Sequence, residues 1–279
     1  MGKLGLIAGG GGLPLEIAEH CEKAGRPLFV IRLKGFADAD LADYAGAEIG
    51  LAELGKCLKS LKRARCDAIC LAGNVARPDF RDFVPDLRGL MVLPSLIAAA
   101  RKGDDAMLRR LVAEFEKEGF AVEGAHEVMS DLALPAGPLG RCVPTPDQMH
   151  DVERALDVAR AIGRLDVGQG AVVCDGLVLA VEAQEGTDAM LRRVADLPGA
   201  IRGAPGAARG VLAKAPKPIQ ERRVDLPTIG LGTVHAAARA GLAGIAGEAG
   251  RLLVLDREAV VALADELGLF ILGAEPLQA

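Results

Sequence analysis

Residues 4–14 read LGLIAGGGGLP: an apolar run, four consecutive glycines, and a proline of the kind that suits the first turn of a helix. This order predicts a strand over Leu4–Ala8, a tight turn over residues 9–12 and a helix from Pro14 to about Ala24. A glycine-rich turn between a strand and a helix is where open α/β sheets bind phosphate groups, because backbone N–H groups and the helix N-terminus attract anions. A tight turn that binds no ligand is the alternative interpretation.

Strand and helix patterns continue to alternate through the first half of the chain. Leucines recur every three or four residues over residues 51–64, which is the spacing of an amphipathic helix. The alternation predicts the α/β class, with a Rossmann-like parallel sheet in an N-terminal domain of residues 1–134. Further strands are expected over residues 27–31, 67–72 and 120–123, and further helices over residues 94–101 and 104–118.

A segment rich in proline and glycine, residues 135–147, predicts a linker between two domains. The C-terminal domain that follows, residues 148–279, is expected to be a distinct α/β domain with a mixed sheet. Its clearest signal is a hairpin, in which two β-rich runs flank the Asp-Gly pair at residues 175–176. Thr187 and Thr233 are expected to cap two of its helices.

The composition excludes several classes of protein. The chain has 279 residues, is 51% hydrophobic and carries a net charge of -5, which excludes intrinsic disorder. No apolar stretch reaches the roughly 20 residues of a membrane span, and the glycine-rich N-terminus does not resemble a signal peptide. The acidic balance and the lack of tryptophan count against nucleic-acid binding. The six cysteines are scattered and read as reduced thiols, so we expect a cytoplasmic protein.

Two turns are expected to meet at one edge of the N-terminal sheet. Gly73 and Asn74 end the strand expected over residues 67–72, at the same carboxyl edge as the glycine turn. An asparagine side chain can both donate and accept hydrogen bonds towards a base or a ribose. A strand-ending turn without a ligand fits this pattern equally well.

Three carboxylates, Glu182, Glu185 and Asp188, lie beside the N-terminus of a helix expected from Asp188 to about Ala195. Magnesium is usually held by one or two carboxylates together with substrate phosphates, so this segment is a candidate metal site. The hydroxyl of Thr187 and the N–H groups behind it could bind a phosphate. Alternatively, Thr187 only caps the helix and Glu185 is a solvated charge.

Residues 202–223 are strongly basic, with six arginines and lysines against one acid. Such a segment suits an anionic ligand. Asp225 follows directly, and it could form a surface ion pair, hold a metal or activate a water beside a bound phosphate. The residues alone therefore indicate a two-domain protein that binds a phosphorylated ligand, with a divalent metal as an option.

Together these motifs resemble those of the LpxI-type UDP-2,3-diacylglucosamine pyrophosphatases of lipid A biosynthesis. The similarity runs in the same order from residue 4 to about residue 240, and the two C-terminal motifs are its most specific part. Many members carry aspartate where this chain has Glu221, so no role is assigned to Glu221. The matching stretches are residues 6–14, 166–173 (DVGQGAVV), 180–188 (AVEAQEGTD), 214–220 (KAPKPIQ) and 223–230 (RVDLPTIG).

The resemblance implies a hydrolase. Water would attack the α-phosphorus of UDP-2,3-diacylglucosamine, with Mg²⁺ as cofactor, and release UMP and 2,3-diacylglucosamine 1-phosphate (lipid X). It further implies a ligand in the cleft between the two domains, a homodimer, and transient contact of the cytoplasmic protein with the inner-membrane surface. The acyl chains require an apolar groove, for which residues 89–100 are one candidate, although a core helix is the more ordinary interpretation of that stretch.

The resemblance also implies roles for individual residues. Asp225 matches the family's essential aspartate, and Lys214 is the leading cation to stabilise the diphosphate. From the chemistry of the residues, Asp225, with Glu182 or Asp188, could hold Mg²⁺ and its water, so all three are candidate metal ligands. The residues expected to bind the substrate are Gly10, Gly11, Gly12, Leu13, Gly73, Asn74, Gln169, Thr187 and Thr233.

Two other functions fit parts of the sequence. The glycine run and Arg32 suggest an NADP-dependent oxidoreductase, but Pro14 stands where the third glycine of a dinucleotide-binding turn belongs. A non-catalytic regulator that binds a nucleotide or a lipid is also compatible with the carboxylates, and release of UMP would exclude it.

Overall fold

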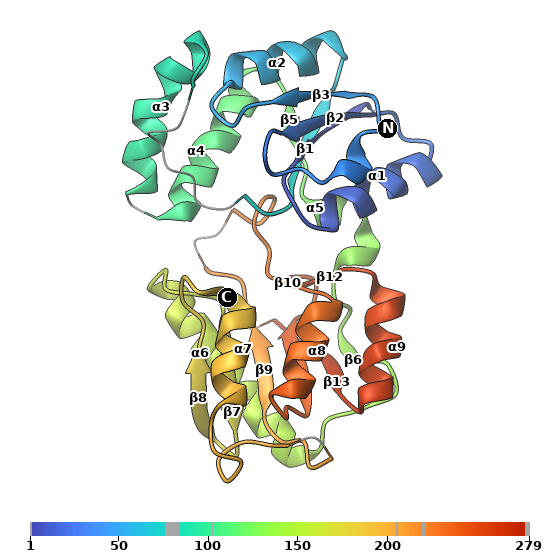
Figure 1. Ribbon diagram of the computed structural model, residues 1–279, viewed down its shortest axis with the longest axis vertical. Coiled ribbons are helices and arrows are strands. Elements are labelled where there is room, and N and C mark those ends of the chain that lie inside the picture. Colours follow the sequence, from blue (N-terminus) through green and yellow to red (C-terminus); the bar gives the residue numbers. More distant parts are fainter. Residues whose placement is uncertain (1, 76–83, 102, 205, 219–220, 277–279) are drawn as a thin grey trace. The chain divides into compact units, whose positions relative to one another are not determined.

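The chain forms two compact units, which can be followed in Figure 1. Unit 1 contains the residues up to Ser130 together with Glu221–Asp225, and unit 2 contains the remaining residues from Asp131 onward. A short late segment of the chain therefore belongs to the first unit. The computed structural model describes residues 2–75, 84–101, 103–204, 206–218 and 221–276.

Unit 1 alternates strands and helices along the chain, as predicted. Its elements in chain order are β1 (Leu4–Ala8), α1 (Leu13–Lys23), β2 (Leu28–Leu33), a 3₁₀ turn (Ala39–Leu41), β3 (Gly46–Ile49), α2 (Leu54–Arg63), β4 (Ala68–Ala72), α3 (Leu87–Ala100), α4 (Asp104–Lys117), β5 (Ala121–Val122) and α5 (Ala125–Val128). A second 3₁₀ turn (Ser130–Leu132) follows α5.

The strands of unit 1 form one parallel sheet in the order β3-β2-β1-β4-β5. Because β1 lies between β2 and β4, the chain reverses its winding direction between β1 and β4. In open parallel sheets, ligands bind at such a switch point, outside the carboxyl ends of the strands. The fold therefore places the glycine turn after β1 at the position where a ligand is expected.

The core of unit 1 joins the sheet to α2, α3 and α4. Ile7, Ile31 and Ile69 from neighbouring strands pack with Leu58 and Leu61 of α2. Burial of each such side chain stabilises the fold by about 1.5–3 kcal/mol. Helix α1 packs against β1 and β2, so that it begins directly behind the glycine turn.

Helix α3 departs from the sequence expectation. It begins at Leu87, well before residue 94, because Asp86 caps it by accepting a hydrogen bond from Gly89 N (2.8 Å). Pro94 lies inside the helix, and most side chains of α3 are exposed or half-buried, so α3 contributes only one side to the core, chiefly through Val92. Neither α3 nor any other helix of the described ranges combines the length and the apolar character that crossing a membrane requires.

Unit 2 is larger and begins with an edge strand. Its elements in chain order are β6 (Gly137–Leu139), α6 (Pro146–Arg164), β7 (Gly170–Cys174), β8 (Leu177–Val181), α7 (Gly186–Ala195), β9 (Val211–Lys214), β10 (Thr228–Ile229), α8 (Leu231–Arg239), β11 (Gly244–Glu248), β12 (Leu253–Val254), α9 (Arg257–Leu267) and β13 (Phe270–Ala274).

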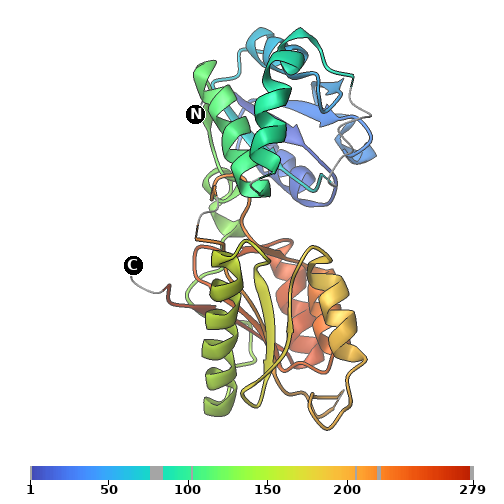
Figure 2. The same ribbon diagram turned by 90° about the vertical axis from the view of Figure 1, so that its left-hand side faces the viewer.

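The main sheet of unit 2 is mixed, with strand order β6-β13-β11-β9-β7-β8. Strands β9, β11 and β13 are parallel, whereas β6 and β7 run antiparallel to their neighbours. One face packs on α6 and the other on α7, α8 and α9, which Figure 2 shows on opposite sides of the strands. The two sheets confirm the predicted α/β class, with a parallel sheet in the first unit and a mixed sheet in the second.

Part of the predicted linker is structured. Gly137–Leu139 form β6, which pairs with β13 at the edge of the sheet. Pro138 is tolerated there, because an edge strand has one side without a neighbouring strand. The predicted hairpin is confirmed, since β7 and β8 are antiparallel. Its turn residues Asp175 and Gly176 both adopt positive φ angles, 50° and 76°, as an Asp-Gly turn requires.

Candidate active site

The glycine turn after β1 and the turn after β4 lie against each other, as predicted. Gly10 N donates to Asn74 O (2.9 Å), and Asn74 N donates back to Gly10 O (2.7 Å). Gly73 has a φ of 92°, and a Cβ there would lie 2.7 Å from Gly10 O, so no other residue fits without strain. The two turns therefore form one compact edge at the switch point of the sheet.

The carboxylate of Asp38 accepts a hydrogen bond from one backbone N–H group of this edge. No sequence pattern pointed to Asp38. Gly11 N donates to Asp38 Oδ2 at 2.7 Å, so this amide is placed to bind an anionic oxygen. Gly12 and Leu13 stand at the N-terminus of α1, where N–H groups have no acceptor within the helix. A phosphate would bind these two amides or displace Asp38.

In unit 2, three of the predicted site residues form one hydrogen-bonded chain. Lys214 Nζ donates to Thr187 Oγ1 (2.9 Å), and the Thr187 hydroxyl donates to Glu182 Oε1 (2.9 Å). Lys214 Nζ also donates to the carbonyl of Thr228 (3.1 Å). Only 4% of Lys214 and 6% of Glu182 is exposed. Because buried charges require paired, hydrogen-bonded surroundings, the chain holds a cation and a carboxylate in fixed positions.

Strand direction explains why these residues meet. Strand β7 is antiparallel to both β8 and β9, so β8 and β9 end at the same edge of the sheet. Glu182 directly follows β8, and Lys214 is the last residue of β9. The loop after Glu182 is short, so the first turn of α7 brings Thr187 back between them.

The two predicted helix caps are wrong. Glu185 and Gly230 occupy the N-cap positions of α7 and α8. Thr187 and Thr233 lie inside the first turns of these helices, and Thr233 Oγ1 accepts a hydrogen bond from Gly230 N (3.5 Å). The Thr187 hydroxyl is thereby directed to Glu182, whereas Thr233 stabilises the start of its own helix.

Two glycines make room for Glu182. A Cβ at Gly168 would lie 2.0 Å from Glu182 O, and a Cβ at Gly170 would lie 2.5 Å from Glu182 Oε2. Gln169, between them, has a buried Oε1 atom; neither this atom nor Glu182 Oε2 has a hydrogen-bond partner in the described part of the chain. Buried polar atoms are normally satisfied, so these two oxygens are candidates to meet a ligand, a water or an ion.

The three predicted magnesium ligands occupy different surroundings. Glu182 is buried, Asp188 is exposed on the first turn of α7, and Asp225 belongs to unit 1. Among the residues described, no group of three or more His, Cys, Asp or Glu side chains could hold a metal ion. Glu182 Oε2 is nevertheless a hard oxygen donor of the kind that Mg²⁺ prefers, and one or two carboxylates beside substrate phosphates suffice. Glu182 fits such a site, and the site itself stays a prediction.

Asp225 is the last residue of the short segment Glu221–Asp225, which belongs to unit 1. Glu221 N donates to Asp105 Oδ1 (2.7 Å), and Arg223 pairs with Glu221 and with Glu116, each at 2.8 Å. The hydrogen bond from Arg223 lowers the pKa of Glu221, and the same bond raises the pKa of Arg223. Asp225 N donates to Glu221 O (3.2 Å). The ion pairs of its neighbours therefore anchor the backbone that carries Asp225.

The cations of the basic stretch over residues 202–223 are divided between the two units. Arg223 belongs to unit 1, and Lys214 lies in the buried chain described above. Residues 219–220, which close one predicted motif, lie outside the described residues. Other cations of the stretch hold local structure: Arg202 donates to Leu197 O (2.7 Å), Arg209 to Asp175 Oδ2 (2.6 Å) and Lys217 to Asp166 Oδ1 (2.7 Å).

Arg32, which suggested an NADP-dependent oxidoreductase, has a structural role. Its Nη1 atom donates to the backbone carbonyls of Leu41 and Tyr44, each at 3.1 Å. These bonds tie β2 to the segment that precedes β3. The oxidoreductase interpretation therefore loses the side chain that supported it.

Two protein-family models match the chain. The LpxI N-terminal domain matches residues 3–132, and the LpxI C-terminal domain matches residues 135–272. The chain is also 69% identical, over 276 residues, to the UDP-2,3-diacylglucosamine pyrophosphatase LpxI of Caulobacter vibrioides, and the alignment covers 99% of both chains. The two matched ranges meet close to Ser130, where the main segment of unit 1 ends.

Proposed function

The chain belongs to the LpxI family, and we propose that it hydrolyses the diphosphate of UDP-2,3-diacylglucosamine in lipid A biosynthesis. The observation that carries the proposal is the 69% identity, over 99% of the chain, to a protein named for that activity. In the proposed reaction water attacks the α-phosphorus. The products are UMP and 2,3-diacylglucosamine 1-phosphate (lipid X).

Lys214 is proposed to stabilise the negative charge that develops on the phosphate oxygens. A cation that is only 4% exposed acts through little water, so its attraction for a phosphate is stronger than at the surface. The hydrogen bond to Thr187 (2.9 Å) supports this role, because a cation held in place needs no reorientation during the reaction. Thr187 is thus a positioning residue for Lys214.

Asp225 is proposed to orient the attacking water and to accept its proton. Mg²⁺ is proposed as the cofactor, held by Asp225, Glu182 and Asp188 beside oxygens of the substrate. When bound, the metal would neutralise part of the charge of the diphosphate. The buried Oε2 atom of Glu182 supports this assignment, because it is an oxygen ligand without a hydrogen-bond partner in the described residues.

The edge formed by the two turns of unit 1 is proposed to bind part of the nucleotide. Its support is geometric, because amides at the start of α1 suit a phosphate and the Asn74 side chain lies close to the glycine turn; a Cβ at Gly11 would be 3.6 Å from Asn74 Nδ2. The full set of proposed substrate contacts is Gly10, Gly11, Gly12, Leu13, Gly73, Asn74, Gln169, Thr187 and Thr233. A homodimer and contact with the inner membrane are further proposals.

Hydrolysis in ¹⁸O-labelled water tests the reaction. The protein is incubated with UDP-2,3-diacylglucosamine and either Mg²⁺ or EDTA, and the products are analysed by mass spectrometry. We expect UMP and lipid X with Mg²⁺, the label in UMP, and no turnover in EDTA. Label in lipid X would mean attack on the other phosphorus. Substrate binding without release of UMP would instead identify a regulator, and full turnover in EDTA would remove the metal from the mechanism.

A further inference from the structure

Helix α3 of unit 1 turns an apolar face to solvent. Leu87, Leu90 and Met91 are 78%, 59% and 62% exposed, and their spacing of three and four residues places them on one side of the helix. Pro94 and Ala98, further along the same side, are also exposed and uncharged. A surface helix normally presents polar residues to water, so this apolar stripe has the character of an interaction surface.

The neighbouring helix α2 turns a cationic face to solvent. Its exposed side chains include Lys56, Lys59, Lys62 and Arg63, and the helix contains no acid. Lys59 and Arg63 form no ion pair with any other residue of the described ranges. An anion that approaches α2 therefore meets charge that the protein has not neutralised.

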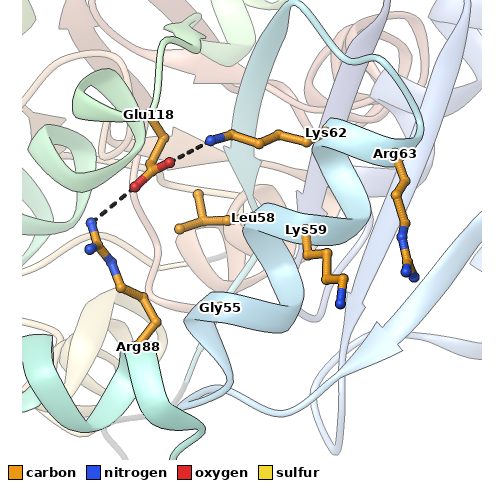
Figure 3. Close-up of a pocket in the computed structure, with 7 residues that line it drawn as sticks. All are labelled: Gly55, Leu58, Lys59, Lys62, Arg63, Arg88 and Glu118. Atoms are coloured by element: carbon orange, nitrogen blue, oxygen red, sulfur yellow. Dashed lines mark hydrogen bonds and ion pairs between the residues drawn. The ribbon is translucent and has the colours of Figure 1, made fainter.

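An open pocket of about 560 Å³ lies between the two helices, and Figure 3 shows the side chains that line it. Lys59, Lys62 and Arg63 line it from α2, and Arg88 lines it from α3. Glu118 is the single acid of the lining, and its carboxylate pairs with both Lys62 and Arg88. Arg88 follows Leu87 in α3, so one cation of the pocket lies beside the start of the apolar stripe.

Hydrogen bonds to the Asp86 side chain connect the first turns of α2 and α3. Asp86 accepts hydrogen bonds from Gly89 N in α3 (2.8 Å) and from Gly55 N (3.1 Å) and Lys56 N (2.7 Å) in α2. The backbones are in direct contact, since a Cβ at Gly89 would lie 2.0 Å from Ala52 O. These contacts fix α2 and α3 relative to each other, and the cationic face of α2 together with the apolar stripe of α3 is called the docking surface below.

We propose that the docking surface binds the face of a lipid bilayer that contains acidic phospholipids. Lys59 and Arg63 would contact the head-group phosphates, while the apolar stripe enters the region between head groups and acyl chains. A second copy of this chain is a poorer occupant, because a symmetric contact through the same surface brings the cations of both copies together. The inference assigns a surface to the membrane contact proposed above, but it does not rest on the proposed reaction, since it concerns binding without substrate.

Vesicle flotation of the full-length protein tests the charged part of the proposal. We expect binding to vesicles of phosphatidylethanolamine and phosphatidylglycerol in equal amounts, none to phosphatidylcholine alone, and weaker binding in high salt. Lys59→Gln and Arg63→Gln should each weaken binding about fivefold. The matched control is Arg154→Gln, an exposed cation on α6 of unit 2, which should change nothing.

The double variant Leu90→Asn, Met91→Asn tests the apolar stripe. It should weaken binding in high salt as well, because burial of apolar side chains is not screened. Its matched control is Leu177→Asn, an apolar residue on β8 that is 56% exposed. All three positions are exposed, and the thermal unfolding midpoint of each variant verifies its fold.

Three results would overturn the proposal. The first is equal binding of the wild type to both kinds of vesicle, or no loss of binding in the variants of α2 and α3. The second is a lipid-independent change of oligomeric state in the Leu90→Asn, Met91→Asn variant, which would assign the stripe to a second copy. The third is that the same double variant binds vesicles like the wild type but has a higher KM for detergent-dispersed substrate. This result would assign the stripe to the acyl chains of the substrate.

Discussion

The hydroxyl of Thr187 donates a hydrogen bond to Glu182 Oε1 at 2.9 Å. With its proton committed to the carboxylate, the Thr187 oxygen has only lone pairs left, and these accept the bond from Lys214 Nζ at 2.9 Å. Glu182 thus orients a hydroxyl that in turn orients a buried ammonium group. Thr187, which the sequence predicts to be a helix cap, instead connects the carboxylate of Glu182 with the ammonium group of Lys214.

Replacement of Thr187 by valine should separate this positioning role from a structural one. Valine has nearly the same shape but removes the hydroxyl, so Lys214 keeps its charge and loses its alignment. We expect kcat to fall about 10- to 100-fold, with a smaller rise in KM from the loss of the proposed substrate contact of Thr187. Steady-state kinetics measures the effect. Thr187→Ser, which keeps the hydroxyl, is the control, and an equal loss in both variants would speak against positioning by the hydrogen bond.

Asp225→Ala should abolish turnover and leave the fold intact. Loss of a metal ligand or a water-activating carboxylate lowers the rate about 100-fold or more, whereas loss of an exposed surface ion pair costs only about 0–1 kcal/mol of stability. The variant should still bind UDP-2,3-diacylglucosamine, which a binding assay by isothermal calorimetry measures.

Glu221→Gln is the matched control for Asp225, because it changes a carboxylate in the same anchored segment. It breaks the pair with Arg223 and should lower stability while leaving most of the turnover. If the two variants lose activity to the same extent, the segment acts as a scaffold and Asp225 has no special role.

Gly12→Val tests whether a ligand approaches the glycine turn. Gly11 is unsuitable, because its φ of 90° strains any side chain, but Gly12 has a φ of −66° and nothing lies within 4 Å of a Cβ placed there. The protein alone therefore tolerates the change, and a bound phosphate does not. We expect KM to rise at least about tenfold, equivalent to 1.4 kcal/mol of lost binding.

Gly199→Val is the control for this variant, since a Cβ at Gly199 also meets nothing within 4 Å. Thermal unfolding should be nearly unchanged in both variants. Unchanged KM in Gly12→Val would leave the turn as a plain connection between β1 and α1.

Asp86→Ala should destabilise unit 1 in a pH-dependent way. Burial opposes ionisation of Asp86, but hydrogen bonds from backbone N–H groups such as that of Gly89 outweigh it and lower the pKa of Asp86. A carboxylate whose folded pKa lies below its unfolded value contributes stability above the unfolded value, near 4, and loses it as the pH falls through the folded value. The variant should cost about 1–2 kcal/mol at pH 7 and progressively less below pH 4.

Tyrosine fluorescence makes this measurement specific for unit 1. Tyr44 is the single tyrosine of the chain, and there is no tryptophan, so its emission in a urea titration follows the unit that contains Asp86. A cost that stays constant from pH 7 to pH 3 would contradict a role of the ionised carboxylate.

Local patterns were sufficient for many of the elements. The apolar run at Leu4–Ala8 is β1 with the predicted bounds, and Asp-Gly at residues 175–176 is the turn of the β7–β8 hairpin. Parallel topology also placed Gly73 and Asn74 beside the glycine turn, because neighbouring parallel strands end at one edge. These predictions succeed because alternation, spacing and turn chemistry act between residues that are close in the chain.

Other elements have no such local signal. Strand β11 reads GIAGE and was not predicted, since two glycines weaken a strand pattern; they are present because a Cβ at Gly244 would meet Phe270 at 2.5 Å and one at Gly247 would meet Leu252 at 2.4 Å. The early start of α3 likewise depends on Asp86, which caps it and binds α2 as well. In both cases the requirement comes from a neighbour in space.

The composition and motifs of the chain settle its fold class and point to its family, and they select most of the side chains proposed for the site. Which of these side chains meet is a different matter. Glu182 joins Lys214 because β7 runs antiparallel to both of their strands, Gly11 meets Asp38 across the sheet edge, and Asp225 sits on unit 1 because Glu221 binds Asp105. Such contacts join residues that are far apart in the chain. They are decided by strand order, strand direction and packing, and none of these produces a periodic pattern in the sequence.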